Sequence, residues 1–243
     1  MATSAYWSAV LSVADEQWGL VTKQQAEATG IAWSTLSRKV GNGALERVAH
    51  GVYRIRGAGG IDHLELRAAW LQLDPAARAW ERGPSSGVVS HRSAATLYGI
   101  GHLPAETHEF TLPGRKQTRR EDVRLHRGRV EQAGWITLRG LPVTMPHRIA
   151  ADLLAGGEDP GAIGQVIADA LRSVFDYPGA MVSAIAPYAA AYGLRRGDGL
   201  GLLRWLLDLS GDPEREVWLA EAAASDPRSS GSVSGAEDGP KSI

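Results

Sequence analysis

The chain has 243 residues, of which 44% are hydrophobic, and a formal net charge of −1, so its size suits one or two domains with a sizeable core. Cysteine is absent, which excludes disulfides, thiolate metal sites and cysteine nucleophiles and fits a reducing cytoplasm. The N-terminus predicts no signal peptide, and the most apolar later stretch, residues 180–194, is too short for a membrane span and is broken by Pro187, so we expect a soluble cytoplasmic protein.

The first predicted element is a helix over residues 5–16. Its apolar positions follow helical spacing: Trp7, Val10, Leu11, Ala14 and, just beyond, Trp18. We expect this face to cover the back of the two helices that come next.

A short helix is predicted over residues 23–29. Thr22 and Gln25 have the spacing of a capping box, which satisfies two free backbone N–H groups at the start of a helix. Gly30 is the residue type that most readily takes the left-handed conformation at a helix end. A second helix after a tight turn completes a helix-turn-helix unit.

This second helix, predicted over residues 33–40, sorts its residues by face. Trp33, Leu36 and Val40 are expected to pack inward. The opposite face carries the candidate DNA-binding side chains Ser34, Thr35 and Arg38, with Lys39 beside them. Such residues suit a helix in a DNA major groove, where arginine pairs two-pronged with guanine. The alternative is an ordinary solvated helix face.

A basic hairpin follows directly. Strands over 45–48 and 52–56 flank Ala49-His50-Gly51, and glycine favours a tight turn. Alternation places Tyr53 and Ile55 on one face, and Arg54 and Arg56 on the other, near His50 at the tip. A helix-turn-helix with such a wing is a winged helix, predicted over residues 1–57, whose wing cations would bind phosphates.

The glycine-rich segment 57–60 is the expected boundary to a second domain over residues 62–220. Helices are predicted there over 62–73, 75–82, 93–98, 146–154, most of 160–209, and 214–224. Strands are predicted over 106–112, 123–127, 135–138 and 141–144. The fold class is therefore α+β: a winged helix, a small and mainly antiparallel sheet with helices, and a helical C-terminal region. Residues 225–243 have little to bury, and we expect a disordered tail.

A run of cations lies within residues 115–129: Arg115, Lys116, Arg119, Arg120, Arg124, Arg127 and Arg129. It is a candidate second surface for nucleic acid or a partner. The alternative is a solvated loop and edge strand, where cations oppose edge-to-edge association.

Ser90 and His91 invite a catalytic interpretation. No partner acid lies at a suggestive spacing, so a cap or a buried hydrogen bond is favoured. The sequence shows no metal-ligand spacing, no phosphate-binding glycine loop and no recognisable pair of carboxylates. We therefore predict that the protein is not an enzyme and has no cofactor or metal.

Three stretches resemble a known family. The run from Gly19 to Gly59, GLVTKQQAEATGIAWSTLSRKVGNGALERVAHGVYRIRGAG, resembles the N-terminal domain of AbiEi-type antitoxins from bacterial abortive-infection (type IV) toxin–antitoxin systems. The resemblance continues in VVSHRSAATLYGIGHL (88–103) and GLPVTMPHRIAADLL (140–154), and so covers most of residues 17–210. It implies a winged helix that represses its own operon and a body that counteracts a nucleotidyltransferase-like toxin encoded next door.

Two functions are open on the sequence. One is this antitoxin, bound to double-stranded DNA of its own promoter. Since one winged helix binds one half-site, we expect inverted repeats with cooperative or dimeric binding. The other is a stand-alone winged-helix transcription regulator whose body senses a ligand or oligomerises. A nucleotidyltransferase-like reading frame beside the gene would favour the first.

Overall fold

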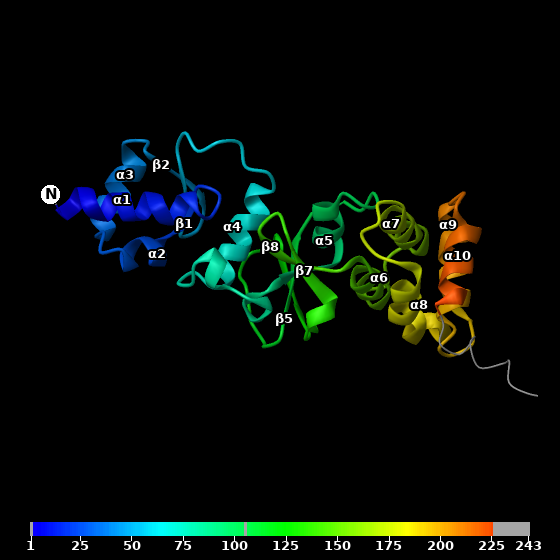
Figure 1. Cartoon of the computed structure of the whole chain (residues 1–243). Coiled ribbons are helices and arrows are strands. Elements are labelled where there is room, and N and C mark those ends of the chain that lie inside the picture. Colours follow the sequence, from blue (N-terminus) through cyan, green and yellow to red (C-terminus); the bar gives the residue numbers. More distant parts are fainter. Residues whose placement is uncertain (1, 105, 226–243) are drawn as a thin grey trace, which may run out of the picture. The chain divides into compact units, whose positions relative to one another are not determined.

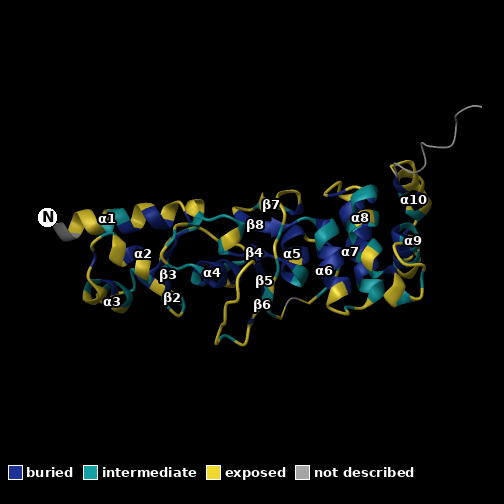
Figure 2. Cartoon of the chain, turned by 90° about the horizontal axis from the view of Figure 1, so that it is seen from below, coloured by how far each residue is buried: buried dark blue, intermediate teal, exposed yellow. Residues whose placement is uncertain are grey.

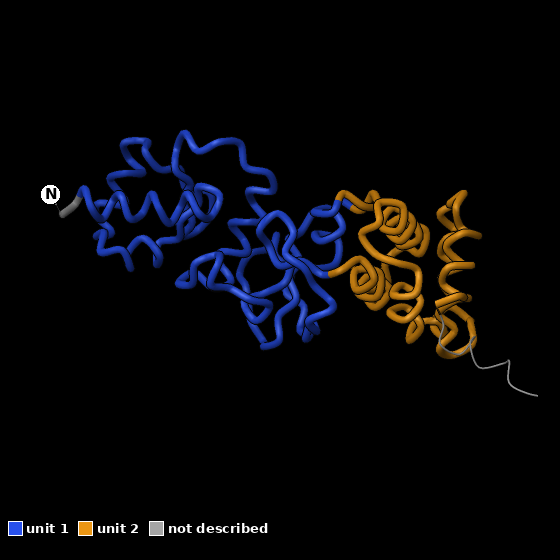
Figure 3. Tube along the Cα trace, in the orientation of Figure 1, with its two compact units in different colours: residues 1–98, 104–144 blue, residues 99–103, 145–243 orange. Residues whose placement is uncertain are grey.

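The computed structural model describes residues 2–104 and 106–225, and the chain divides into two compact units (Figure 3). The first unit contains Met1–Tyr98 and Pro104–Thr144, and the second contains Gly99–Leu103 and Met145–Ile243. Contacts therefore group the winged-helix segment with the sheet that follows it. Folding of residues 1–57 as a separate domain stays a prediction, and the predicted tail lies outside the described residues from residue 226 onward.

The N-terminal segment has the element order of a winged helix (Figure 1). Its elements are α1 (Ala2–Asp15), β1 (Leu20–Thr22), α2 (Lys23–Ala28), α3 (Trp33–Gly41), β2 (Leu45–Ala49) and β3 (Val52–Ile55). The three strands form an antiparallel sheet in the order β1-β3-β2. The predicted winged helix-turn-helix is confirmed.

Buried apolar side chains hold this segment together. They are Val10, Val13, Ala14, Val21, Ala26, Ile31, Leu36, Leu45 and Tyr53. Three come from α1, so this helix covers the helix-turn-helix as predicted, and Figure 2 shows exposed and buried residues alternating along it. Leu11 is 37% exposed, so its predicted inward position is wrong. It follows Val10 by one residue, which is about 100° around the helix and off the buried stripe.

Two tryptophans also differ from the prediction. Trp33 is 47% exposed because it lies in the first turn of α3, at the edge of the buried face. Its ring packs across that of Tyr53, with 6.5 Å between centroids. Trp18 was predicted to share the apolar face that covers the helix-turn-helix, but it does not belong to that core. It lies beyond the end of α1 with a φ of 65°, and its ring meets that of Trp70 edge-on, with 6.1 Å between centroids.

The predicted capping box at the start of α2 is confirmed. Gln25 N donates to Thr22 Oγ1 at 3.1 Å, and Thr22 N donates to Gln25 Oε1 at 3.0 Å. The same two side chains reach a distant segment, because Thr22 Oγ1 donates to Pro75 O and Gln25 Nε2 donates to Ala77 O at 2.8 Å. The N-terminus of α2 is thus bonded to the chain that follows the winged helix.

Gln17 completes this arrangement. Its Nε2 donates to Leu20 O and to Gln25 Oε1, and its Oε1 accepts from Ala79 N at 3.2 Å. Gln17, Thr22 and Gln25 are almost completely buried. We call these three side chains, together with the backbone groups of residues 75–79 that they bind, the amide network.

The helix predicted over residues 75–82 is wrong, since only a short 3-10 turn, η1 (Ala79–Glu81), forms there. The backbone of this segment bonds to the amide network and to Arg82 instead of forming helical bonds. Arg82 donates to the carbonyls at the end of α4 (Leu64–Leu73), those of Trp70 and Leu71, and also to Asp74 O and Ala77 O. Burial lowers the pKa of Arg82 to about 10.

The second sheet has five strands in the order β6-β5-β4-β8-β7. They are β4 (Val88–Val89), β5 (His108–Leu112), β6 (Val123–Arg127), β7 (Trp135–Leu138) and β8 (Leu141–Thr144). The α+β fold class and the predicted hairpin of β7 and β8 are confirmed. Pairing in this sheet is mixed, because β4–β5 and β7–β8 are antiparallel whereas β4–β8 and β5–β6 are parallel. The short helix α5 (His91–Tyr98) follows β4.

The second unit is helical, as predicted. It contains α6 (Pro146–Ala155), α7 (Pro160–Arg172), α8 (Pro178–Ile185), the 3-10 segment η4 (Ala186–Tyr192), α9 (Gly199–Ser210) and α10 (Arg215–Ala224). Gly164 lets α7 approach α9 closely, because a Cβ there would lie 2.1 Å from Leu206 O. Throughout the described chain, every helix falls short of the length and apolar character that a membrane crossing needs.

Candidate nucleic-acid interface

The outward face of α3 carries the predicted base-reading residues. Ser34 and Arg38 are exposed and Thr35 is half-buried. Within the described residues, the Arg38 side chain makes no hydrogen bond or ion pair, so its five N–H donors remain open to a ligand. Lys39 lies at the flank, where its Nζ packs 4.3 Å from the ring centroid of Trp7 on α1.

The wing is the hairpin of β2 and β3. Gly51 turns the chain at its tip with a φ of 71°, a conformation that glycine adopts without strain. His50 is exposed beside it, and Arg47 Nη2 lies 3.1 Å from His50 Nδ1. Arg47 is an exposed wing cation that was not predicted from the sequence. It directly follows Glu46 in β2, whereas the alternating Arg54 and Arg56 of the other predicted strand form a clearer basic pattern.

Arg54 and Arg56 were predicted as a pair, but their surroundings differ. Arg54 is half-buried and donates through Nη2 to the carbonyls of Ala58 (3.1 Å) and Gly59 (2.9 Å). It thereby holds the chain that leaves the wing. Arg56 is exposed and packs against Gly43, where a Cβ would come within 3.1 Å of its Nη1.

A partly exposed aromatic cluster joins α3 to the wing. Trp33 contacts Tyr53, and Lys23 Nζ of α2 lies 4.6 Å above the Trp33 ring. Tyr53 is paired with Arg47 across the hairpin. Burial raises the pKa of the Tyr53 hydroxyl, and the nearby charge of Arg47 opposes this rise. The start of α2, the start of α3 and the wing therefore meet around the buried Tyr53, with the exposed ring of Trp33 and the cations Lys23 and Arg47 beside it.

The basic run divides into bonded and open side chains. Lys116 donates to Leu73 O at the end of α4, Arg120 pairs with Asp122, and Arg124 lies 3.9 Å from Glu109. Arg115, Arg119 and Arg127 are exposed and make no side-chain hydrogen bond or ion pair with any other described residue. Arg129, two residues beyond the end of β6 (Val123–Arg127), is exposed.

Ser90 and His91 lie in a polar cluster between α5 and the sheet. The Ser90 hydroxyl is fully buried and is bonded by His91 Nδ1 and by Thr111 Oγ1, each at 2.9 Å. The His91 ring stacks on that of His126 at 3.6 Å, and His126 Nε2 lies 3.3 Å from Glu109 Oε1. Glu109 is the acid that sequence spacing did not reveal, and strand pairing brings it close.

The polar groups of this cluster are satisfied by hydrogen bonds to one another. Burial raises the pKa of the Glu109 carboxyl, but bonds from His126 and from Arg92 N, with the charge of His91, outweigh it and lower the pKa. The Ser90 side chain is fully buried. The predicted structural role of Ser90 and His91 agrees with this geometry. Among the residues that the structure describes, no group of three or more candidate ligands could hold a metal ion.

Comparison with known protein families gives a match over the winged helix. A family model described as "Transcriptional regulator, AbiEi antitoxin" matches residues 8–56. The match spans the winged helix from α1 to the end of the wing, and it confirms the resemblance of this segment to AbiEi-type antitoxins. No curated protein matches the chain.

Proposed function

We propose that the protein is a DNA-binding antitoxin that represses its own operon through the winged helix. The observation that supports this proposal most directly is the exposed face of α3 beside a cationic wing. Both lie in the segment that matches the family of transcriptional regulators. A helix-turn-helix binds by placing its second helix in the major groove, so the residues that the protein leaves uncovered on α3 are those that would meet base edges.

The side chains divide into base-reading and phosphate-binding groups. Arg38 would pair two-pronged with a guanine, and Ser34 and Thr35 would bond to neighbouring base edges. The phosphate-binding group consists of Lys39, His50, Arg54 and Arg56, to which we add Arg47. Within it, Arg56 and Arg47 would contact phosphates most directly, because Arg54 already bonds to Ala58 and Gly59.

We further propose that the rest of the chain counteracts a nucleotidyltransferase-like toxin, as the resemblance over residues 88–103 and 140–154 implies. This role requires no catalysis or cofactor. A nucleotidyltransferase-like reading frame beside the gene, and rescue of cells that express it by this protein, would support the toxin half. Failure of rescue would leave a winged-helix regulator with a sensing or oligomerising body.

A gel-shift titration tests the DNA half. The protein is titrated against DNA from upstream of its own gene and against unrelated DNA of equal length. Arg38→Ala should lose about 1–3 kcal/mol of discrimination at one base pair, because a two-pronged arginine–guanine pair is worth that much. Arg195→Ala, an exposed arginine of the second unit, is the matched control.

Each result has a definite meaning. Specific retention that is lost in Arg38→Ala and kept in the control supports the proposal. Equal retention of both DNAs by the wild type would refute specific recognition. An unchanged preference across promoter variants in Arg38→Ala would refute the base-reading role of Arg38.

A further inference from the structure

The tip of the wing is joined to the chain segment 113–122, which we call the basic loop. The link is a single side chain, Gln72 at the end of α4. Gln72 Nε2 donates to His50 O at 2.7 Å, and Gln72 Oε1 accepts from Arg120 Nη1 at 2.6 Å. Because one amide group separates these two bonds, His50 O and Arg120 Nη1 lie within about 8 Å of each other. The two cationic segments, far apart in sequence, are neighbours.

The basic loop is also fixed at other points. Lys116 Nζ donates to Leu73 O, and Arg120 Nε donates to Asp122 Oδ1 at 2.8 Å. Asp122 O in turn accepts from His108 N of β5 at 2.7 Å. These bonds hold the loop against the end of α4 and the start of the sheet, so its remaining side chains project from a supported backbone.

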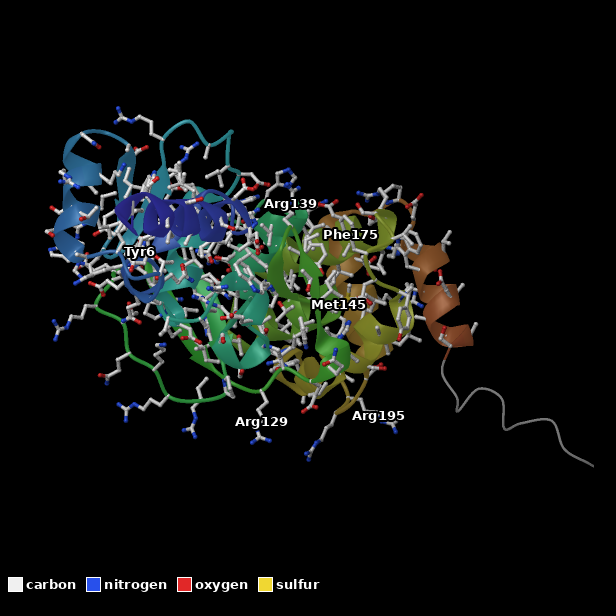
Figure 4. All side chains as sticks on the ribbon, turned by 60° about the vertical axis from the view of Figure 1, so that its left-hand side comes forward. Tyr6, Arg129, Arg139, Met145, Phe175 and Arg195 are labelled. Atoms are coloured by element: carbon white, nitrogen blue, oxygen red, sulfur yellow. The ribbon has the colours of Figure 1, made fainter. Side chains whose placement is uncertain are left out.

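Two cations of the loop remain open. Arg115 and Arg119 are exposed, and neither makes a side-chain bond within the described chain. The acidic side chains of the loop neutralise little of this positive charge. Asp122 is paired with Arg120, so Glu121 is the remaining acid of the loop. Figure 4 shows the green segment that leads toward the labelled Arg129, with several nitrogen-tipped side chains directed away from the ribbon.

The rest of the basic run has a different setting. Arg124 and Arg127 belong to β6, which is an edge strand of the five-stranded sheet. Cations on an edge strand oppose pairing with other chains. Arg124 also lies near the buried Glu109. The edge-strand interpretation therefore fits Arg124 and Arg127, whereas Arg115 and Arg119 lie outside the strand, in the loop that precedes it.

We propose that the basic loop extends the DNA interface beyond the wing, with Arg115 and Arg119 bound to backbone phosphates of double-stranded DNA. This inference rests on the proposed DNA binding by the winged helix. Each strand of DNA carries a charge about every 3.4 Å along the helix axis. The limit of about 8 Å between His50 O and Arg120 Nη1 places the start of Arg119, the residue before Arg120, within a few phosphates of the wing tip. The loop adds affinity and footprint, and it adds no sequence preference.

The test is the salt dependence of binding. Fluorescence anisotropy of labelled upstream DNA is measured with the full-length protein between 50 and 200 mM KCl. Arg115→Ala/Arg119→Ala should reduce the slope of log K against log salt by about 2, because each phosphate contact contributes about 0.9. Over this range the wild type should lose about 12-fold more affinity than the variant. Both side chains are exposed and unbonded, so the variant should fold normally.

Two controls sharpen the result. Arg195→Ala/Arg196→Ala removes the same charge from exposed positions in the second unit and should leave the slope unchanged. Gln72→Ala leaves the charge unchanged but removes the link between the wing tip and the loop. It should weaken binding to all sequences equally.

The outcomes separate the inference from the function that it rests on. A wild type that does not bind the DNA overturns both. A wild type that binds, with the same slope in Arg115→Ala/Arg119→Ala, overturns the loop contact alone. An equal loss in the second-unit control would show a general charge effect and would also overturn it. A slope reduced only in the loop variant, with promoter preference kept, supports it.

Discussion

Replacing Gln25 by leucine tests the amide network. Gln25 is 3% exposed, and its Oε1 is the acceptor for Thr22 N at 3.0 Å. Leucine has a similar volume but cannot accept a hydrogen bond. The substitution therefore removes polar contacts from α2 and leaves the apolar core of the winged helix in place.

The magnitude follows from the groups that lose their partner. Gln17 Nε2 still bonds to Leu20 O, and Ala77 O still accepts from Arg82. Thr22 N is left unsatisfied at a fully buried residue, which costs about 1–3 kcal/mol, and the lost bond to Ala77 adds about 1 kcal/mol. We expect Gln25→Leu to lower the free energy of unfolding by about 2–4 kcal/mol.

Urea unfolding followed by tryptophan fluorescence is the assay, because Trp18 and Trp70 lie in the same unit as the network. The chain supplies a matched control in Gln24, the neighbouring and exposed glutamine of α2. Gln24→Leu should shift the free energy of unfolding by less than about 0.5 kcal/mol. Equal unfolding midpoints for the two variants would refute the network.

Two further predictions concern charged groups. Hydrogen bonds from Arg67 and then Arg139 lower the pKa of Asp62 to about 2, so its stabilising effect is full above pH 4 and is lost as the pH falls through about 2. Between pH 5 and pH 3, the urea midpoint should therefore fall further in the wild type than in Asp62→Asn. An equal fall in the two proteins would contradict this. Arg82→Met should lower the free energy of unfolding by about 3–5 kcal/mol, because the carbonyls of Trp70 and Leu71 at the end of α4 lose their donor. A loss below about 1 kcal/mol in urea unfolding would show that these hydrogen bonds from Arg82 do not stabilise the protein.

Local signals in the sequence were sufficient for the winged helix. The spacing of Thr22 and Gln25 set the start of α2, and both form the expected bonds. The glycine of the wing turn and the alternation of Tyr53 with Arg54 set the hairpin. These signals act between residues close in sequence, so a reading of the chain in order captures them.

Signals that depend on distant partners were not predictable. The segment after α4 has helical composition, but its backbone bonds to Gln25 and Arg82 instead. Likewise, Glu109 meets His126 only because β5 and β6 pair in parallel register. The charge of the basic run was visible, but its nearness to the wing depends on Gln72, a residue with no distinguishing pattern.

The amide network also constrains how such a protein can evolve by recombination. A winged helix is often regarded as an exchangeable part, joined to its neighbour by a linker such as residues 57–60. Here a graft that replaced Gln17, Thr22 and Gln25 would leave the carbonyls of Pro75 and Ala77 facing unmatched side chains. Substitutions on the exposed face of α3 leave these bonds intact, whereas substitutions at the start of α2 change the hydrogen-bond partners of residues 75–79.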